Sequence, residues 1–286
     1  MTNQAVLAGD IGGTKTTLAL FGSAGDLLRE KTYQNNMFSS LQEVISTFLG
    51  DLDEMVVRAC FGVAGPVHDN RVSMTNLDWT IDGRKLGDHF AISRVLLVND
   101  LVATTAGAVL LPDESLVTIN VGRPVAGETI GVLAPGTGLG QSFAIPVNNR
   151  LHPFPSEGGH CSFAPRNREQ IELLEFMLKK RPHVSVEQVC SGMAIPDLYA
   201  YVTTCCPEPE WIKKMLAETD DHTPVIVNAA NESLTGGAAC EPAIRTLQLF
   251  VDILAAEAAN LALKVLATGG IYLGGGMPPR LLSFFD

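Results

Sequence analysis

Two short glycine-rich segments carry residue types that could hold the phosphates of a nucleotide. The first contains Asp10, Ile11, Gly12, Gly13 and Thr14, and the second spans residues 134–140, with Gly136, Thr137 and Gly138 at its centre. Glycine lets the backbone turn with its N–H groups exposed to phosphate oxygens, and each segment adds a threonine hydroxyl. Asp10 could bind Mg²⁺ through water. One such turn alone is equally well explained as a hairpin, but two turns can grip a triphosphate from opposite sides.

Neither segment matches the common nucleotide-binding fingerprints. The P-loop pattern G-x-x-x-x-G-K-S/T and a G-x-G-x-x-G that opens a helix are both missing at these positions. The sequence therefore does not support a P-loop or a Rossmann site.

The pair Asn99 and Asp100 follows a short apolar run at residues 94–98. This run is typical of a strand, and the carboxyl ends of strands are where open α/β sheets place their ligands. Asp100 could therefore accept the proton of an attacking hydroxyl as a general base. The alternative is that Asp100 caps the helix expected over residues 101–111.

Glu157 and His160 flank two glycines in a segment that we expect to be a loop, because Pro153 and Pro155 precede it. A carboxylate and an imidazole this close can exchange hydrogen bonds with neighbouring hydroxyls of a sugar. A zinc site is the competing interpretation, but two ligands do not complete a tetrahedral shell. Glu187 could join the site, or could be a surface carboxylate at the start of a helix.

The elements that must position these residues repeat along the chain. Strands are expected at residues 5–10 and 16–21 around the first glycine turn, and at 129–134 and 141–147 around the second. A further strand at 31–34, a helix at 41–48 and a buried strand at 56–63 follow the first pair. A strand at 271–273 runs into glycines 274–276. This weak duplication predicts two similar α/β lobes facing a central cleft, a small one over residues 1–108 and a large one over 109–286.

The composition narrows the class of protein. The chain has 286 residues, is 46% hydrophobic and carries a formal net charge of −11, which would repel a nucleic-acid backbone. The most apolar stretch, residues 250–266, is interrupted by charged residues, and no signal peptide opens the sequence, so membrane spanning and secretion lose support. Six cysteines without a C-x-x-C pair indicate reduced thiols. We expect a soluble, cytoplasmic protein without nucleic-acid or membrane partners.

Taken in order, seven short motifs make the sequence similar to the bacterial glucokinase family, the ATP-dependent type in the hexokinase–actin–Hsp70 superfamily. They are Gly9-Asp10-Ile11-Gly12-Gly13-Thr14, Met74-Thr75-Asn76-Leu77-Asp78-Trp79, Val98-Asn99-Asp100, Gly136-Thr137-Gly138-Leu139-Gly140, Glu157-Gly158-Gly159-His160, Val184-Ser185-Val186-Glu187 and Gly274-Gly275-Gly276.

The resemblance implies two ribonuclease-H-like lobes, as in actin-like ATPases, and phosphorylation of glucose to glucose 6-phosphate, the entry step of glycolysis, with ATP and Mg²⁺. It implies that Asn99, Asp100, Glu157, His160 and Glu187 bind glucose, and that Asp100 deprotonates the 6-hydroxyl. It also implies that both glycine turns cradle ATP phosphates and that Gly275 lies near the nucleoside. Related ROK kinases carry a cysteine-rich zinc motif after the sugar-binding histidine; only Cys161 follows here, which predicts no zinc.

Family members normally continue past residues 279–285 into another strand and a final helix, so the family's C-terminal tail is expected to be lacking. This departure motivates an alternative function, a catalytically weak or inactive sugar-binding sensor or regulator. An acyl-phosphate kinase or an actin-like assembly protein would leave Glu157, His160 and Glu187 unexplained. The sequence does not decide between a monomer and a homodimer.

Overall fold

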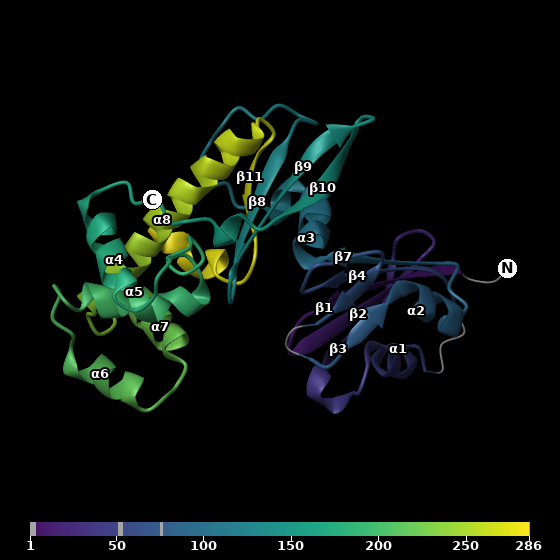
Figure 1. Cartoon of the computed structure of the whole chain (residues 1–286), viewed down its shortest axis with the longest axis horizontal. Coiled ribbons are helices and arrows are strands. Elements are labelled where there is room, and N and C mark those ends of the chain that lie inside the picture. Colours follow the sequence, from purple (N-terminus) through teal and green to yellow (C-terminus); the bar gives the residue numbers. More distant parts are fainter. Residues whose placement is uncertain (1–3, 51–53, 75–76, 286) are drawn as a thin grey trace. The chain divides into compact units, whose positions relative to one another are not determined.

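The computed structural model describes residues 4–50, 54–74 and 77–285, which form two compact units (Figure 1). Unit 1 is Met1–Thr104 and unit 2 is Thr105–Asp286. Each unit has its own sheet and its own hydrophobic core. The functional lobe boundary that the sequence predicts, after residue 108, stays a prediction.

Unit 1 is built on a five-stranded sheet of order β3-β2-β1-β4-β7. Strands β1, β2 and β3 are antiparallel neighbours, whereas β4 is parallel to both β1 and β7. Its elements are β1 (Gln4–Ile11), β2 (Lys15–Gly22), β3 (Leu27–Gln34), η1 (Asn35–Met37), α1 (Leu41–Leu49), β4 (Met55–Val63), β5 (Arg71–Ser73), β6 (Thr80–Asp82), α2 (Gly83–Phe90), β7 (Arg94–Asn99) and α3 (Asp100–Ala108), the last of which continues into unit 2.

Helix α1 covers one face of this sheet because its sequence is amphipathic. Leu41, Val44, Ile45 and Phe48 recur with helical spacing, and all four are buried in the unit 1 core. The Ser40 side chain accepts a hydrogen bond from the backbone N–H of Glu43 and so caps the helix, which ends at a glycine. The helix predicted over residues 41–48 is confirmed.

Unit 2 is built on a four-stranded sheet of order β10-β9-β8-β11 covered by helices. The long helix α8 packs against β8 and β11, and α5 and α7 pack against α8 (Figure 1). Its elements are η2 (Asp113–Ser115), β8 (Ile130–Pro135), β9 (Leu139–Val147), β10 (Arg150–Ser156), η3 (Gly158–His160), α4 (Arg168–Leu178), η4 (Gly192–Ala194), α5 (Ile195–Val202), α6 (Glu210–Ala217), α7 (His222–Leu234), α8 (Glu241–Val265), β11 (Gly270–Leu273) and η5 (Pro278–Phe284).

The two sheets repeat one topology. In each, three antiparallel strands (β3-β2-β1 and β10-β9-β8) are followed by a strand parallel to the third (β4 and β11). A glycine turn joins β1 to β2 in unit 1 and β8 to β9 in unit 2. The predicted α/β class with two related sheets is confirmed.

Helix α8 is the one helix in the described part of the chain that is long and apolar enough to cross a membrane. Of its most apolar window, however, 56% is buried inside the protein. Packing on α5, α7 and β8 makes it a core helix of unit 2.

Some elements differ from those expected. The helix after Asn99 ends at Ala108, three residues before the predicted end. Strand β10 was not predicted; it tolerates Pro153 and Pro155 because it lies at the edge of its sheet. Thr75 and Asn76, which belong to one of the matched motifs, lie outside the described residues.

Candidate active site

The first glycine turn is held by a residue far along the sequence. Within the turn, the N–H of Gly12 donates to the carbonyl of Lys15 at 2.9 Å. Asn35 then donates from Nδ2 to the carbonyl of Gly12 at 2.8 Å and from its backbone N–H to the carbonyl of Thr14 at 2.9 Å. Because Asn35 is buried, this bracket fixes the turn in unit 1. Asn35 was not predicted from the sequence.

Gly9 lies where two apolar side chains close over the strand that leads into the turn. A Cβ at this position would lie 2.6 Å from the ring of Phe61 and 2.8 Å from Leu18. Contacts this short would displace both core residues, so glycine lets β1 and its neighbours pack tightly just before Asp10.

Asn99 and Asp100 stand where β7 ends and α3 begins. The backbone N–H of Leu101 donates to Asn99 Oδ1 at 3.0 Å and to Asp100 Oδ1 at 2.9 Å. Asn99 also donates from Nδ2 to the carbonyl of Gly65 at 3.3 Å. Asp100 is therefore the first residue of the helix, and its carboxylate is partly engaged by the following N–H, so a helix-start role and a chemical role are both compatible with this position.

Two carboxylates of unit 1 influence each other. Removal from water raises the pKa of Asp100, and the negative charge of Asp10 raises it further, while the N–H of Leu101 acts in the opposite direction. Removal from water also raises the pKa of Asp10. Both groups come from the carboxyl ends of parallel strands, β1 and β7, and a cation bound near them would relieve this cost.

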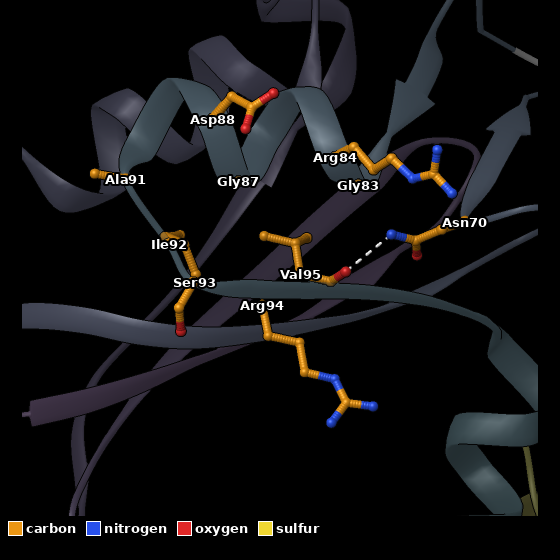
Figure 2. Close-up of a pocket in the computed structure, with 10 residues that line it drawn as sticks. All are labelled: Asn70, Gly83, Arg84, Gly87, Asp88, Ala91, Ile92, Ser93, Arg94 and Val95. Atoms are coloured by element: carbon orange, nitrogen blue, oxygen red, sulfur yellow. Dashed lines mark hydrogen bonds between the residues drawn. The ribbon is translucent and has the colours of Figure 1, made fainter.

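Strand β7 is fixed along its outer edge by a single side chain (Figure 2). Asn70 donates from Nδ2 to the carbonyl of Val95 at 2.9 Å, and its Oδ1 accepts from the N–H of Leu97 at 2.7 Å. Its own carbonyl accepts from the N–H of Gly83, the first residue of α2. Asn70 thus takes the place of a sixth strand beside the one that ends at Asn99.

The open depression in Figure 2, of about 690 Å³, lies between α2 and β7. None of the predicted site residues lines it. One of its polar side chains, Asn70, is bonded to the backbone of β7.

The second glycine turn is braced from two sides within unit 2. The N–H of Gly136 closes the turn on the carbonyl of Gly138 at 2.9 Å, and the N–H of Gly192 donates to the carbonyl of Gly136 at 2.7 Å. On the other side Gly275 has φ +82°, and a Cβ there would lie 2.8 Å from the carbonyl oxygen of Pro135. Gly275 therefore lies beside the turn, and its position near the nucleoside stays a prediction, whereas Gly192 was not predicted.

Three predicted sugar-binding residues are brought together next to this turn. Glu187 Oε2 accepts a hydrogen bond from the N–H of Leu139 at 2.8 Å, and its Oε1 lies 3.8 Å from His160 Nδ1. His160 Nε2 lies 3.6 Å from Glu157 Oε2. The Glu157 and His160 side chains are 81% and 64% exposed, against 24% for Glu187, so the first two are open to a ligand.

The local structure around these residues differs from the sequence-based expectations. The segment expected as a loop forms a short 3₁₀ turn, η3, that begins at Gly158. Glu187 does not open a helix but lies in a turn. Its own backbone N–H donates to the carbonyl of Gly159 at 2.9 Å. The interpretation of Glu187 as a residue at a helix start is therefore wrong.

No group of three or more His, Cys, Asp or Glu side chains within residues 4–50, 54–74 and 77–285 could hold a metal ion. The cysteines, including the exposed Cys161, are free thiols. The expectation that the protein binds no zinc stays a prediction.

Duplicated sheets with a glycine turn at the same place in each define the class of the protein by its fold, that of the actin-like ATPases. Residues 7–286 match the family model of glucokinase. A glucokinase from Nostoc punctiforme is 36% identical in an alignment of 303 positions that covers 98% of this chain and 86% of the relative. This chain belongs to the glucokinase family.

Solved structures agree with this assignment. A crystal structure of glucokinase from an Antarctic psychrotroph has a TM-score of 0.81 and 32% identity, covering 98% of this chain and 87% of that one. A ROK-family glucokinase from Streptomyces griseus, solved with glucose and AMPPNP, has a TM-score of 0.63 at 19% identity, covering 97% of this chain and 86% of that one. This second likeness concerns the fold alone.

Proposed function

We propose that this protein transfers the γ-phosphate of ATP to the 6-hydroxyl of glucose and releases glucose 6-phosphate and ADP. The observation that carries this proposal is the position of Glu187. It accepts a hydrogen bond from the backbone at the second glycine turn, here called the phosphate turn (residues 136–139), and lies 3.8 Å from His160 in residues 157–160, here called the sugar loop. In this proposal the phosphate turn and the sugar loop are therefore linked directly within unit 2. Membership of the glucokinase family supports the same activity.

Asp100 is the general base of this proposal. Its carboxylate takes the proton of the 6-hydroxyl as the sugar oxygen bonds to the γ-phosphorus, and the bond from that phosphorus to the β–γ bridging oxygen breaks to release ADP. The raised pKa of Asp100 makes its carboxylate a better proton acceptor than an ordinary aspartate.

Glucose hydroxyls are assigned to Asn99, Glu157, His160 and Glu187. Carboxylate oxygens accept hydrogen bonds from hydroxyls, and the imidazole and amide can also donate them. Glu157 and His160 have the exposure that this role requires.

The nucleotide phosphates are assigned to the two glycine turns. Residues 9–14 in unit 1 and residues 136–138 in unit 2 would hold them, with Gly275 near the nucleoside. Space beside Gly136 supports this assignment, since a Cβ there would meet nothing within 4 Å.

Mg²⁺ fits the donor set of unit 1. Asp10 lies at the end of β1 and is open to solvent, although partial burial raises the pKa of its carboxylate, and carboxylate oxygen and water are the ligands that Mg²⁺ prefers. When bound with ATP, the ion would neutralise phosphate charge.

A cytoplasmic location and the absence of nucleic-acid and membrane partners are part of this proposal, and the oligomeric state, monomer or homodimer, stays open. The acidic net charge of −11 supports the absence of nucleic acid. Nothing in the described residues favours the sensor alternative, which predicts glucose binding without turnover.

Substitution of Asp100 by Asn tests the proposal. Glucose binding measured by calorimetry should be retained, while kcat for glucose 6-phosphate formation should fall by roughly two or more orders of magnitude. Asp88→Asn, on the exposed side of α2, is the matched control and should keep wild-type turnover.

Two outcomes would count against the assignment. Wild-type protein that binds glucose but makes no glucose 6-phosphate with Mg·ATP would favour the sensor. Equal loss of glucose binding and turnover in Asp100→Asn would mean that Asp100 binds sugar and is not the base.

A further inference from the structure

Glu257 is the one charged side chain that is buried among the residues that the structure describes. It projects from α8 and is 3% exposed. Its Oε2 accepts a hydrogen bond from Asn260 Nδ2 at 3.0 Å, and Lys264 Nζ lies 3.9 Å from Oε1. Burying a carboxylate is costly unless it is well bonded, and nothing in the proposed reaction uses Glu257.

The remaining partner of Glu257 is a buried side chain of β9. Gln141 donates from Nε2 to Glu257 Oε1 at 2.8 Å, across 116 positions of sequence. Gln141 is itself 3% exposed and lies opposite Ser156, the last residue of β10, in the sheet. The bond therefore joins the core helix to the strand that begins at the phosphate turn.

The other end of the Gln141 amide supports the sugar loop. A Cβ on Gly158 would overlap Gln141 Oε1 and lie 2.7 Å from its Cδ. Gly158 follows Glu157 directly and lies two residues before His160. The backbone at Gly158, between Glu157 and His160, thus packs directly against the Gln141 amide.

An ionised carboxylate can only accept hydrogen bonds, whereas a glutamine amide has one donating and one accepting end. Glu257 therefore selects the orientation of Gln141 in which Nε2 points to α8 and Oε1 points to Gly158. A neutral apolar side chain at position 257 would leave the amide without its partner and free to turn or shift.

We propose that Glu257 and Gln141 are positioning residues, which set the height and orientation of residues 157–160 and so the affinity of the site for its sugar. This inference rests on the proposed function, because it takes Glu157 and His160 as sugar ligands. It adds two residues that touch neither sugar nor nucleotide.

The test compares Glu257→Leu, Gln141→Leu and the conservative Glu257→Gln. We expect each leucine variant to raise the KM for glucose roughly tenfold, since small displacements of binding groups cost this much, while the KM for ATP stays within about twofold. Glu257→Gln keeps an accepting oxygen and should stay within about threefold of wild type. The double leucine variant should be no worse than Gln141→Leu, because the pair acts as a unit.

Thr246→Val is the matched control for loss of a buried polar group. Thr246 lies on the same helix, is fully buried and bonds only locally, to the carbonyl of Pro242 at 2.7 Å. The Thr246→Val variant should have a lower melting temperature than wild type and the same KM for glucose. An unchanged KM in both leucine variants, or an equal rise in Thr246→Val, would overturn the proposal.

A second measurement does not depend on turnover. Hydrogen exchange of the amides of residues 158–161 should speed up at least several-fold in Glu257→Leu and not in Thr246→Val, because only the first variant removes support from the loop. If wild-type protein phosphorylates no sugar but exchange responds in this way, the proposed function fails and the positioning role stands. Unchanged exchange in Glu257→Leu would overturn the positioning role.

Discussion

At the scale of single residues, the carboxylate of Asp100 acts against the stability of the fold. Removal from water and the charge of Asp10 hold its pKa above the ordinary value of 3.8. The folded state therefore binds the proton more tightly than the unfolded chain does. Stability from this group is present below pH 3.8 and is lost as the pH rises through the folded pKa.

It follows that Asp100→Asn should melt at a higher temperature than wild type at pH 7, even though it removes the proposed base. The difference should shrink as the pH is lowered through the folded pKa towards 3.8, because wild-type Asp100 then becomes neutral as well. Thermal melts from pH 7.5 down to pH 4 measure this trend.

Asp82→Asn serves as the control of opposite sign. Although desolvation opposes them, the N–H groups of Lys85 and Arg84 and the charge of Arg71 keep the pKa of Asp82 below its ordinary value. Its ionised form stabilises the fold at pH 7, so this variant should melt lower. If Asp100→Asn melted at a lower temperature than wild type at pH 7, the ionised Asp100 carboxylate would not be destabilising the fold.

Candidate site residues that lie in short local motifs could be located from the sequence, and residues that act through distant partners could not. The glycine turns, Asn99-Asp100 and the Glu157–His160 segment are short motifs with characteristic spacing. Asn35, Gly192 and Gln141 act through partners that lie 23, 56 and 116 positions away. For residues of this kind, the sequence offers one signal, a charged or polar residue within an apolar stretch, such as Glu257 in α8.

At the scale of elements, the same contrast holds. Helix α1 was predicted with both ends because its apolar stripe, Ser40 cap and terminal Gly50 are local signals. Strand β10 was missed because its two prolines oppose a strand in the interior of a sheet, and only the strand order reveals that it is an edge. The short β5, β6 and α2 depend on tertiary bonds such as the Arg71–Asp82 ion pair at 3.0 Å.

The edge of β7 gives a prediction for one of these tertiary bonds. Asn70→Ala removes both hydrogen bonds to Val95 and Leu97 and should destabilise unit 1 by about 1–3 kcal/mol. Urea unfolding followed by the fluorescence of the buried Trp79 would report the change.

The neighbouring Asp69→Ala separates side-chain bonding from backbone strain. Asp69 and Asn70 both have left-handed backbone angles, with φ of 49° and 62°, so an alanine is strained at either position. Equal destabilisation by the two variants would mean that the bonds of Asn70 to β7 contribute nothing.

At the scale of the whole molecule, the two units have separate cores and one tryptophan each. Trp79 belongs to the unit 1 core, while Trp211 packs against the unit 2 core. We expect Phe48→Ala, a fully buried residue of unit 1, to lower unfolding stability by about 3–5 kcal/mol in the Trp79 signal and to leave the Trp211 signal nearly unchanged.

Trp79→Phe and Trp211→Phe backgrounds make each signal readable alone. Unfolding curves of these two single-tryptophan proteins without the Phe48→Ala substitution supply the reference. If Phe48→Ala moved both transitions by the same amount, the units would unfold as one cooperative body.

The double commitment of Glu187 has a practical consequence for enzyme engineering. One of its oxygens already accepts a hydrogen bond from the Leu139 N–H, so in the proposed site the other oxygen is the freer one for a sugar hydroxyl. A library randomised at this codon would recover variants impaired towards donor and acceptor together. Searches for altered sugar preference should therefore begin at the freely exposed Glu157.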